Sequence, residues 1–291
     1  MAAVALSIIA FWLMSRHGYP GGPDECIALK DCYCEAIGPG IAAQPANAWS
    51  NAGFVAIGLL VLADAGRRSG AGRMARDSRA AWLYGAVAVF LGIGSFAFHG
   101  SVRAWGGYVD VLSMHAFIAY VLAYDLDRVH GWTWRRFVTW FAGMLTAFAI
   151  AIAFVPPEHG KTLFAVFVLV VLLVEAAVSY PMLRPWSRVR LDPRRMPWFW
   201  TGLGLFIVAN VIWNLSRTDG VWCNPQSLFQ GHAVWHLLTG ASVGAFYLYF
   251  RGEGPTDRAH SDYRDANATP GGTTNPAPAG LPGTHDSDHP S

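Results

Sequence analysis

Seven blocks of about 18 to 22 mostly apolar residues run through the chain, and their length restricts the fold more than any other feature. Each block is long enough to cross a hydrocarbon core of about 30 Å as an α-helix, a length that a helix in a soluble core does not need. We predict spans at residues 48–66, 80–100, 108–125, 135–155, 162–183, 197–215 and 230–250. Charged residues make up 14% of the chain, about half the share in an average soluble domain. The predicted fold class is an all-α polytopic membrane protein, a seven-helix transmembrane bundle.

Basic residues are gathered in alternate loops, and this pattern predicts the orientation of the bundle. Arg67, Arg68, Arg73, Arg76 and Arg79 follow the first span, Arg128, Arg135 and Arg136 the third, and Arg184, Arg188, Arg190, Arg194 and Arg195 the fifth. The only Lys or Arg residues in the intervening loops are Arg103, Lys161 and Arg217. By the positive-inside rule the Arg-rich loops and the C-terminus face the cytoplasm, and the segment before the first span lies outside. Because the charge is divided among loops rather than gathered in one patch, no nucleic-acid partner is expected.

Two segments flank the predicted transmembrane domain of residues 31–251. Residues 1–30 begin with the apolar run Ala2–Met14, which is shorter than an ordinary span. This run is consistent with a signal-peptide core, an interfacial helix or a short eighth span. Residues 252–291 are rich in Pro, Gly, Thr, Asp and Asn, so they bury too little apolar surface to fold. We predict a disordered cytoplasmic tail there.

All four cysteines fall on segments that are predicted to lie outside, a compartment that is commonly oxidising. They are Cys26, Cys32, Cys34 and Cys223. Cys34 lies shortly before the first span and Cys223 in the last outer loop, so a bridge between them would tie the N-terminal segment over the helix bundle. The alternative is that the cysteines are free buried thiols.

Polar and ionisable residues inside a membrane are costly, so each of them needs a reason to be there. The candidates are Ser95, His99, Asp110, His115, Glu175, His232 and His236. His232 and His236 stand four residues apart, which places both imidazoles on one face of a helix, one turn apart. Such a pair can supply two metal ligands, or it can form hydrogen bonds across helices.

Three predicted helix ends meet in the same outer layer of the membrane. The second span ends at His99, the third begins near Asp110, and the seventh begins near His232. Three neutral imidazoles would leave a fourth tetrahedral position open, as in catalytic zinc sites. We therefore predict a zinc site formed by His99, His232 and His236. Ser95 shares a helix face with His99, which places its hydroxyl near the proposed zinc. The alternative is that this hydroxyl bonds to a carbonyl of its own helix, as Ser often does in membrane helices. Asp110 is expected either to orient a histidine or to transfer a proton.

With these residues the chain resembles a known family, the alkaline ceramidases. Members of that family are seven-helix zinc-dependent membrane amidases, and their superfamily also includes the adiponectin-type receptors. The resemblance extends from about Cys34 to about Phe250. It rests on Cys34-Glu35, Asn47-Ala-Trp-Ser-Asn51, Gly94-Ser95-Phe-Ala-Phe-His99, Asp110 and Gly231-His232-Ala-Val-Trp-His236. It implies zinc held by the three histidines, with Ser95 and Asp110 beside the reacting water, and it also implies the Cys34–Cys223 disulfide.

The resemblance also implies a reaction: hydrolysis of the amide bond of ceramide or a related N-acyl lipid to a fatty acid and a long-chain base. The expected partners are a membrane lipid substrate and the bilayer, with no obligatory protein partner, and the expected context is sphingolipid metabolism. Two alternatives stay open. One is a receptor-like or lipid-sensing seven-helix protein with a structural zinc, against which the intact Ser95 and Asp110 argue. The other is a transporter with Glu175 and His115 in a polar pathway, although the sequence has no internal repeat.

The resemblance also raises the question of a calcium site. Animal members of this family look to bind calcium through an acidic cluster just before the first span. Asp31 and Glu35 are the candidate calcium ligands here, but Gln44 stands where a carboxylate is expected. The spacing between Glu35 and Asn51 is also shorter than in the animal members. Calcium prefers several hard oxygen ligands, so the loss of a carboxylate weakens the predicted site.

Several tryptophans are predicted to lie close to the outer interface, where indole rings prefer to sit. They are Trp49, Trp105, Trp222 and Trp235. We interpret most of them as ordinary interfacial residues and assign none of them to the substrate.

Overall fold

The computed structural model of the chain describes residues 2–67, 73–154, 157–179, 189–191 and 195–255. The helices are α1 (Ala2–His17), α2 (Glu25–Leu29), α3 (Pro45–Ser50), α4 (Ala52–Asp64), α5 (Arg73–Arg76), α6 (Ser78–Ser101), α7 (Ala104–His130), α8 (Trp134–Phe154), α9 (Pro157–Ser179), α10 (Met196–Ser216) and α11 (Gly231–Arg251). Strands β1 (Val189–Leu191) and β2 (Glu253–Pro255) pair antiparallel. The predicted tail lies outside the described residues from position 256 onward, as do Arg68, Arg184, Arg188 and Arg194 of the predicted basic loops.

Seven helices of the described chain are long and apolar enough to cross a membrane, which confirms the predicted fold class. The first span, Pro45–Asp64, combines α3 and α4, and the fifth occupies Thr162–Ser179 within α9. Each predicted span coincides with one of these helices. The largest difference is at α7, which begins four residues earlier and ends five residues later than the predicted span 108–125. The polar ends of a membrane helix extend past the hydrocarbon core into the interface, so the apolar stretch underestimates the length of the helix.

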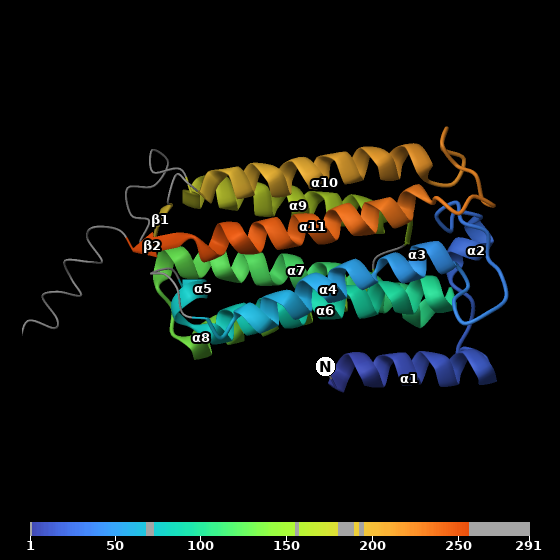
Figure 1. Cartoon of the computed structure of the whole chain (residues 1–291), viewed down its shortest axis with the longest axis horizontal. Coiled ribbons are helices and arrows are strands. Elements are labelled where there is room, and N and C mark those ends of the chain that lie inside the picture. The colour runs from blue at the N-terminus through green and yellow to red at the C-terminus, as the bar shows by residue number, and fades with distance from the viewer. Residues whose placement is uncertain (1, 68–72, 155–156, 180–188, 192–194, 256–291) are drawn as a thin grey trace, which may run out of the picture. The chain divides into compact units, whose positions relative to one another are not determined.

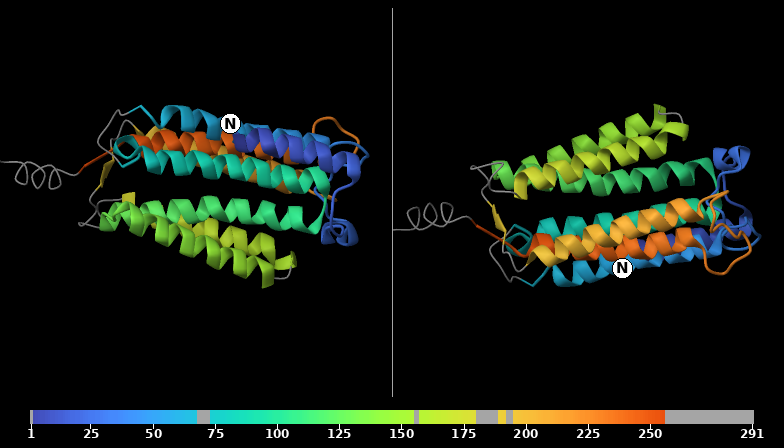
Figure 2. Two further views of the ribbon diagram at one scale, coloured as in Figure 1. Left: turned by 90° about the horizontal axis from the view of Figure 1, so that it is seen from below. Right: turned by 90° about the horizontal axis from the view of Figure 1, so that it is seen from above.

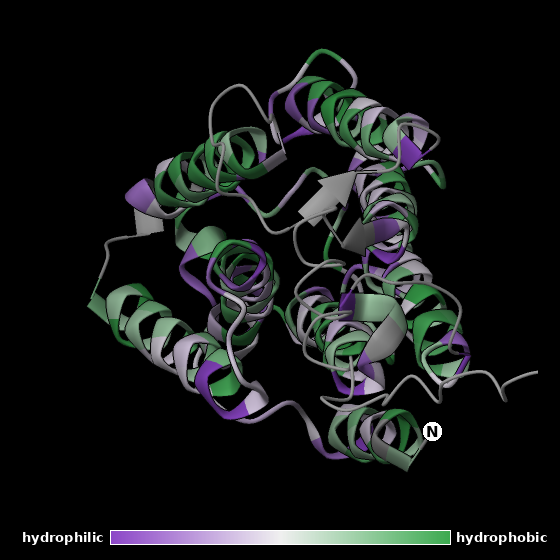
Figure 3. Ribbon diagram, turned by 90° about the vertical axis from the view of Figure 1, so that its left-hand side faces the viewer, coloured by the Kyte–Doolittle hydropathy of each residue, from purple (hydrophilic) through white to green (hydrophobic). Residues whose placement is uncertain are grey.

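The long helices run side by side along one axis, as Figures 1 and 2 show. α7 packs against α6, α8 and α9, and α11 packs against α4 and α10. In the end-on view of Figure 3, apolar residues cover much of each long helix. This distribution is expected of helices that contact neighbours on one side and lipid on the other.

Glycines allow close approach at two helix crossings that position the site. A Cβ atom on Gly58 of α4 would lie 2.7 Å from the carbonyl oxygen of Gly85 on α6. A Cβ atom on Gly94 of α6 would lie 2.8 Å from the Cβ and Oγ atoms of Ser113 on α7. Small residues at such crossings let membrane helices pack backbone to backbone. α6 is therefore held tightly between α4 and α7.

The two ends of the bundle differ in what covers them. Residues 18–44 and the α10–α11 loop (residues 217–230) lie at one end, which we call the histidine end. The structure contains the predicted Cys34–Cys223 disulfide and a second disulfide, Cys26–Cys32, that the sequence did not single out. α5, β1 and β2 lie at the opposite end in Figure 1, which we call the arginine end because Arg73, Arg128 and Arg251 lie there.

α1 lies beside the bundle, and Phe11 contacts Phe96 of α6 with ring centroids 4.9 Å apart. The helix has 16 residues, fewer than the roughly 20 that a full span requires. The interpretation of this segment as a signal peptide, an interfacial helix or a short span therefore stays a prediction.

Candidate metal centre

Three buried histidines converge at the histidine end of the bundle. His99 lies in the last turn of α6, and His232 and His236 lie in the first turns of α11. One ligand atom from each lies within 4.8 Å of the others, and no other group of three or more His, Cys, Asp or Glu in the described part of the chain is arranged in this way. The Nε2 atoms of His99 and His232 are 3.1 Å apart. The predicted convergence of these helix ends is thus present in the structure.

Gln44 fixes the orientation and the tautomer of His99. The Gln44 amide nitrogen donates both of its protons, one to the carbonyl of Cys32 at 2.5 Å and one to the carbonyl of Glu35 at 2.9 Å. The amide oxygen must therefore be the atom that lies 2.8 Å from His99 Nδ1. His99 Nδ1 carries the proton and donates it, which leaves the lone pair on Nε2.

Ser50 fixes His236 in the same manner. Its hydroxyl donates its single proton to the carbonyl of Asn47 at 2.8 Å, so its contact of 2.8 Å with His236 Nδ1 requires that the imidazole be the donor. The unprotonated atom of His236 is then Nε2, which lies 3.4 Å from Ser95 Oγ. Two imidazoles from two helices thus have protonated Nδ1 atoms bonded to the protein and Nε2 atoms available as ligands.

This donor set fits zinc. Neutral imidazoles whose other nitrogen is hydrogen-bonded to the protein are the usual zinc ligands, and three of them leave one tetrahedral position open. The structure brings two such Nε2 atoms together with His232 in a buried pocket. Facing lone pairs repel one another unless a proton or a cation lies between them. The arrangement can therefore hold a metal ion.

Ser95 and Asp110 lie beside the histidines. Ser95 is one turn before His99 on α6, and Asp110 is in the second turn of α7. The close crossing at Gly94 brings α6 and α7 together, and the Ser95 and Asp110 side chains line one cavity. Ser95 does not make the bond to its own helix carbonyl that was the simpler alternative. Both residues line a cavity, so both are accessible to a ligand inside the bundle.

Tyr33 covers the histidines from outside the membrane spans. Its ring stacks on His232 at 4.2 Å and meets His99 edge-on at 5.4 Å. Tyr33 and Cys34 have φ values of 64° and 66°, which are unfavourable for side chains of this size. The Cys34–Cys223 disulfide joins this strained segment to the α10–α11 loop. Burial, followed by the charge of Asp110, raises the pKa of Tyr33 well above its usual value, so the phenol stays neutral.

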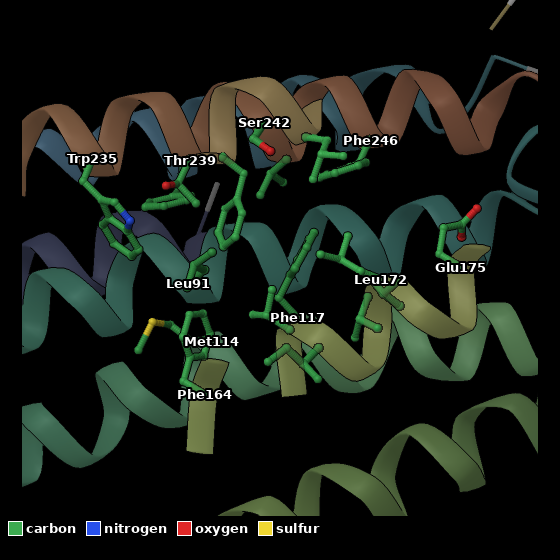
Figure 4. Close-up of a pocket in the computed structure, with 18 of the residues that line it drawn as sticks. Leu91, Met114, Phe117, Phe164, Leu172, Glu175, Trp235, Thr239, Ser242 and Phe246 are labelled. Atoms are coloured by element: carbon green, nitrogen blue, oxygen red, sulfur yellow. The ribbon is translucent and has the colours of Figure 1, made fainter. Parts of the chain in front are cut away.

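An apolar cavity of about 120 Å³ extends through the bundle from Ser95 and Asp110 to Glu175 near the arginine end. Figure 4 shows part of its wall, with Trp235, Thr239, Ser242 and Phe246 from α11 on one side. The remaining wall comes from α4, α6, α7, α9 and α10, and it is formed mostly by Phe, Leu, Val, Ile and Met side chains. The candidate metal centre thus lies next to one end of an apolar cavity.

Glu35, one of the two candidate calcium ligands, is buried against the start of α3. Its two carboxylate oxygens accept hydrogen bonds of 2.8 Å from the backbone N–H groups of Ala46 and Asn47. A carboxylate in this position caps the helix and interacts favourably with its dipole. Asp31 belongs to no cluster of metal-ligating side chains within the described ranges. A calcium site at Asp31 and Glu35 stays a prediction from the resemblance.

Trp235 has a different environment from the one predicted. Trp49 and Trp222 are 54% and 60% exposed, as interfacial residues should be. Trp105 donates to the carbonyl of Pro20 at 3.0 Å. Trp235, in contrast, lines the cavity and stacks on His232. Trp235 is therefore the exception among the four, because it lies on the face of α11 that is directed into the bundle.

Three further residues of this site were not predicted as parts of it: Gln44, Ser50 and Tyr33. Gln44 was considered only as a position where a calcium ligand is missing. It lies three residues before the Asn47–Asn51 motif, and this closeness in sequence could have indicated that it belongs to the site. Ser50 lies inside that motif. Tyr33 is flanked by Cys32 and Cys34, and cysteines on both sides of an aromatic residue indicate that its position is held.

His115 and Glu175, the two residues of the transporter alternative, have separate environments. His115 Nδ1 lies 2.8 Å from the carbonyl of Val111, and its ring is surrounded by Phe148, Phe164 and Phe167. Glu175 forms an ion pair of 2.6 Å with Arg128. A polar pathway through both residues has no support in these contacts.

Comparison with known proteins agrees with the architecture. A family profile described as Ceramidase matches residues 33–258, which include all three histidines, Ser95 and Asp110. Curated proteins give no match. Since the matched region covers well over half of the sequence, the chain belongs to the Ceramidase family.

Proposed function

We propose that this chain is a zinc-dependent membrane hydrolase that cleaves the amide bond of ceramide or a related N-acyl lipid, releasing a fatty acid and a long-chain base. Membership of the Ceramidase family implies hydrolysis of amide bonds. The observation that carries the finer proposal is the position of the three histidines with Ser95 and Asp110 at one end of an apolar cavity. This arrangement presents a polar reaction site to one end of a long apolar ligand.

Zinc bound by the three histidines would polarise the amide carbonyl and lower the pKa of water from about 15.7 towards about 7. The chain's own residues supply the proton transfers. The Asp110 carboxylate accepts a proton from the attacking water and returns it to the leaving amine nitrogen. The Ser95 hydroxyl donates its proton to the carbonyl oxygen as that oxygen gains negative charge. Gln44 and Ser50 keep His99 and His236 in the correct tautomer.

The length of the cavity suits a lipid chain. Asp110 and Asp125 are 15 residues apart on α7, so the levels of the Ser95–Asp110 pair and the Arg128 cluster are about 22 Å apart along the helix. Half of the hydrocarbon core is about 15 Å thick. In length, a chain from a lipid of one leaflet therefore matches the distance between the two levels.

The surroundings of the site favour a substrate from the membrane. Val221, Leu228 and Phe229 of the α10–α11 loop are 82%, 90% and 90% exposed. Apolar side chains with this exposure at the end of a membrane bundle favour contact with lipid. The described arginines of the Arg-rich loops, such as Arg73, Arg128 and Arg195, lie at the opposite end, so the positive-inside rule predicts that the histidine end faces the outer side.

The receptor-like alternative, in which zinc is structural, has weaker support. Structural zinc sites are usually closed by four protein ligands. The described chain supplies three histidines and no further metal-ligating side chain in that cluster. An open position next to an acid, a hydroxyl and a cavity favours catalysis.

Asp110→Asn tests the proposal because it separates chemistry from metal binding. The variant should retain about one zinc per chain, as three histidines form a complete protein ligand set. Its kcat for a ceramide-type amide should fall by about 10²- to 10⁴-fold, since the proton acceptor is lost. The measurements are metal analysis of the purified protein and release of fatty acid from a panel of N-acyl lipids.

Asp77→Asn is the matched control. Asp77 caps α6 at the arginine end, and Asn caps helices equally well, so this variant should hydrolyse at the wild-type rate. Wild-type turnover by zinc-loaded Asp110→Asn would refute the proposed role of Asp110. Absence of hydrolysis of every N-acyl lipid by zinc-loaded wild-type protein would refute the hydrolase and favour the receptor-like alternative.

A further inference from the structure

Two polar atoms on α11 line the cavity without a hydrogen-bond partner among the described residues. They are Nε1 of Trp235 and Oγ1 of Thr239, and both are inaccessible to solvent. The residues stand four apart, so they share one face of the helix. Figure 4 shows both side chains on the α11 wall of the cavity, with the indole ring extending into the space.

Each of these two atoms is unusual for its residue type. An indole N–H can only donate, and a buried indole normally finds an acceptor. A Thr hydroxyl inside a helix commonly bonds back to the carbonyl four residues earlier, but Thr239 makes no such bond in this structure. Leaving buried polar atoms unpaired is costly, so a partner supplied by a ligand is the economical explanation.

The position of the pair relative to the metal centre is well defined. The Trp235 ring stacks on His232 with centroids 5.3 Å apart and an interplanar angle of 11°, and it meets His236 edge-on at 5.2 Å. Thr239 lies one turn further along α11, about 6 Å deeper. The two free polar atoms therefore lie just beneath the site where the amide would react.

Deeper polar groups of the same wall have partners within the protein. Ser242 donates to the carbonyl of Gly202 at 2.7 Å. Glu175 is paired with Arg128 at 2.6 Å. The unpaired atoms are thus confined to the part of the α11 wall closest to the histidines, and the wall beyond is apolar or internally bonded. A matching ligand carries a polar group close to its reacting amide and an apolar chain beyond it.

We propose that Trp235 and Thr239 bind a hydroxyl group on the amine part of the substrate, and that they select N-acyl amino-alcohol lipids over N-acyl amines without a hydroxyl. Trp235 Nε1–H donates to the hydroxyl oxygen, and the hydroxyl proton is donated to Thr239 Oγ1. A hydroxyl satisfies both atoms because it is donor and acceptor at once, whereas a methylene satisfies neither. This inference rests on the proposed function and assigns two specificity-determining residues to it.

The test compares two synthetic amides with the same acyl chain and the same carbon chain on nitrogen, one with and one without hydroxyl groups near the amide. The wild-type protein should prefer the hydroxylated amide in kcat/KM by about 10-fold or more, because a site built to bond a hydroxyl rejects an analogue that lacks it. Trp235→Phe keeps an aromatic ring against His232 but removes the N–H. Thr239→Val keeps the shape and removes the hydroxyl. Each variant should lose the preference mainly by turning over the hydroxylated amide more slowly, with the deoxy amide changed less than about 3-fold.

Ser242→Ala is the matched control, because it removes a cavity hydroxyl that the protein already satisfies. It should keep the wild-type preference. Metal analysis of each variant shows whether the histidine site is intact. An equal fall for both amides in Trp235→Phe would show that the indole only supports the histidines, and lack of preference in the wild-type protein would show that the unpaired atoms bind water. Either result overturns the inference.

A binding measurement keeps the inference separate from the proposed function. Both amides are added to detergent-solubilised wild-type, Trp235→Phe and Thr239→Val proteins, and the shift in melting temperature is recorded. Selective stabilisation of the wild-type protein by the hydroxylated amide supports the inference even if neither amide is cleaved, in which case the hydrolase alone fails. Equal shifts for both amides in the wild-type protein contradict the inference even if both amides are cleaved.

Discussion

Two groups of buried polar residues mark the two ends of the bundle, and they are satisfied in opposite ways. At the arginine end, Arg128 pairs with Asp125 at 3.0 Å, Glu175 at 2.6 Å and Glu253 at 2.9 Å. At the histidine end, the Nε2 atoms of His99 and His232 face one another at 3.1 Å. The first group consists of opposite charges that complete one another. The second brings like atoms together, which is the arrangement that a cation completes.

The arginine end acts as a brace between elements that are distant in sequence. Arg128 lies on α7, Glu175 on α9 and Glu253 on β2 directly after α11. Tyr124 donates to Glu253 at 2.8 Å and Tyr249 donates to Glu175 at 2.6 Å, which adds neutral donors to the cluster. Such a cluster need not add net stability over an apolar core, but the removal of one charge from it is costly. The histidine end should respond differently, since its residues are arranged around a ligand.

The largest expected effect comes from Arg128→Met, which leaves three buried carboxylates without their cation. The free energy of unfolding should fall by about 3 to 5 kcal/mol. Thermal or denaturant unfolding of the purified protein in detergent measures this change. Protein that remains folded should keep its zinc, because the two groups share no residue.

Arg79→Met is the control for this prediction. Arg79 pairs with Asp77 at 2.9 Å, but its side chain is 61% exposed. An exposed pair contributes about 0 to 1 kcal/mol, so this variant should be close to wild type. If Arg128→Met removed zinc while leaving the stability unchanged, the division into a brace and a binding site would be wrong.

An intermediate effect is expected at Gln44, which orients His99. Gln44→Leu removes the acceptor of the His99 Nδ1–H, and partners of this type are worth about 10- to 100-fold in metal affinity. Competition with a chelator of known affinity measures the change. Gln44→Glu separates orientation from folding: it keeps the acceptor for His99 but loses the bonds to the carbonyls of Cys32 and Glu35. Zinc should bind Gln44→Glu more tightly than Gln44→Leu, and equal weakening in both would assign Gln44 to folding alone.

The smallest expected effect is the pH dependence that Glu253 confers on the arginine end. Burial raises the pKa of Glu253 to about 7, while the charge of Arg128 opposes the rise. A carboxyl with a raised pKa in the folded state stabilises the fold fully below its unfolded pKa and loses that contribution as the pH rises through about 7. The wild-type protein should therefore lose on the order of 1 kcal/mol more stability than Glu253→Gln between about pH 6 and 8.

Unfolding curves of both proteins at the two pH values check this difference. Glu25→Gln, at an exposed position of the histidine end, should keep the wild-type pH profile. A profile of Glu253→Gln that parallels the wild type would show that Arg128 keeps Glu253 ionised throughout this range.

Much of the candidate site was predictable because helix periodicity determines which side chains share a face. His232 and His236 are four residues apart, as are Ser95 and His99, and the order of the spans places these pairs in one layer of the membrane. The contact between Gln44 and His99 was not predicted, for a physical reason. Gln44 lies in an irregular segment, where the direction of a side chain depends on contacts with α6 and with residues 32–35 rather than on any repeat.

The sequence by itself determined the membrane spans, their number and the layer in which the histidines lie. These properties follow from the length of each apolar block, from loop charge and from helical spacing, all of which are local. Only the tertiary structure decided which nitrogen of His99 and His236 carries the proton, that Tyr33 covers His232, and that Trp235 and Thr239 face a cavity. Those facts depend on close crossings such as Gly94 against Ser113 and on the Cys34–Cys223 bridge, which join segments that no local pattern relates.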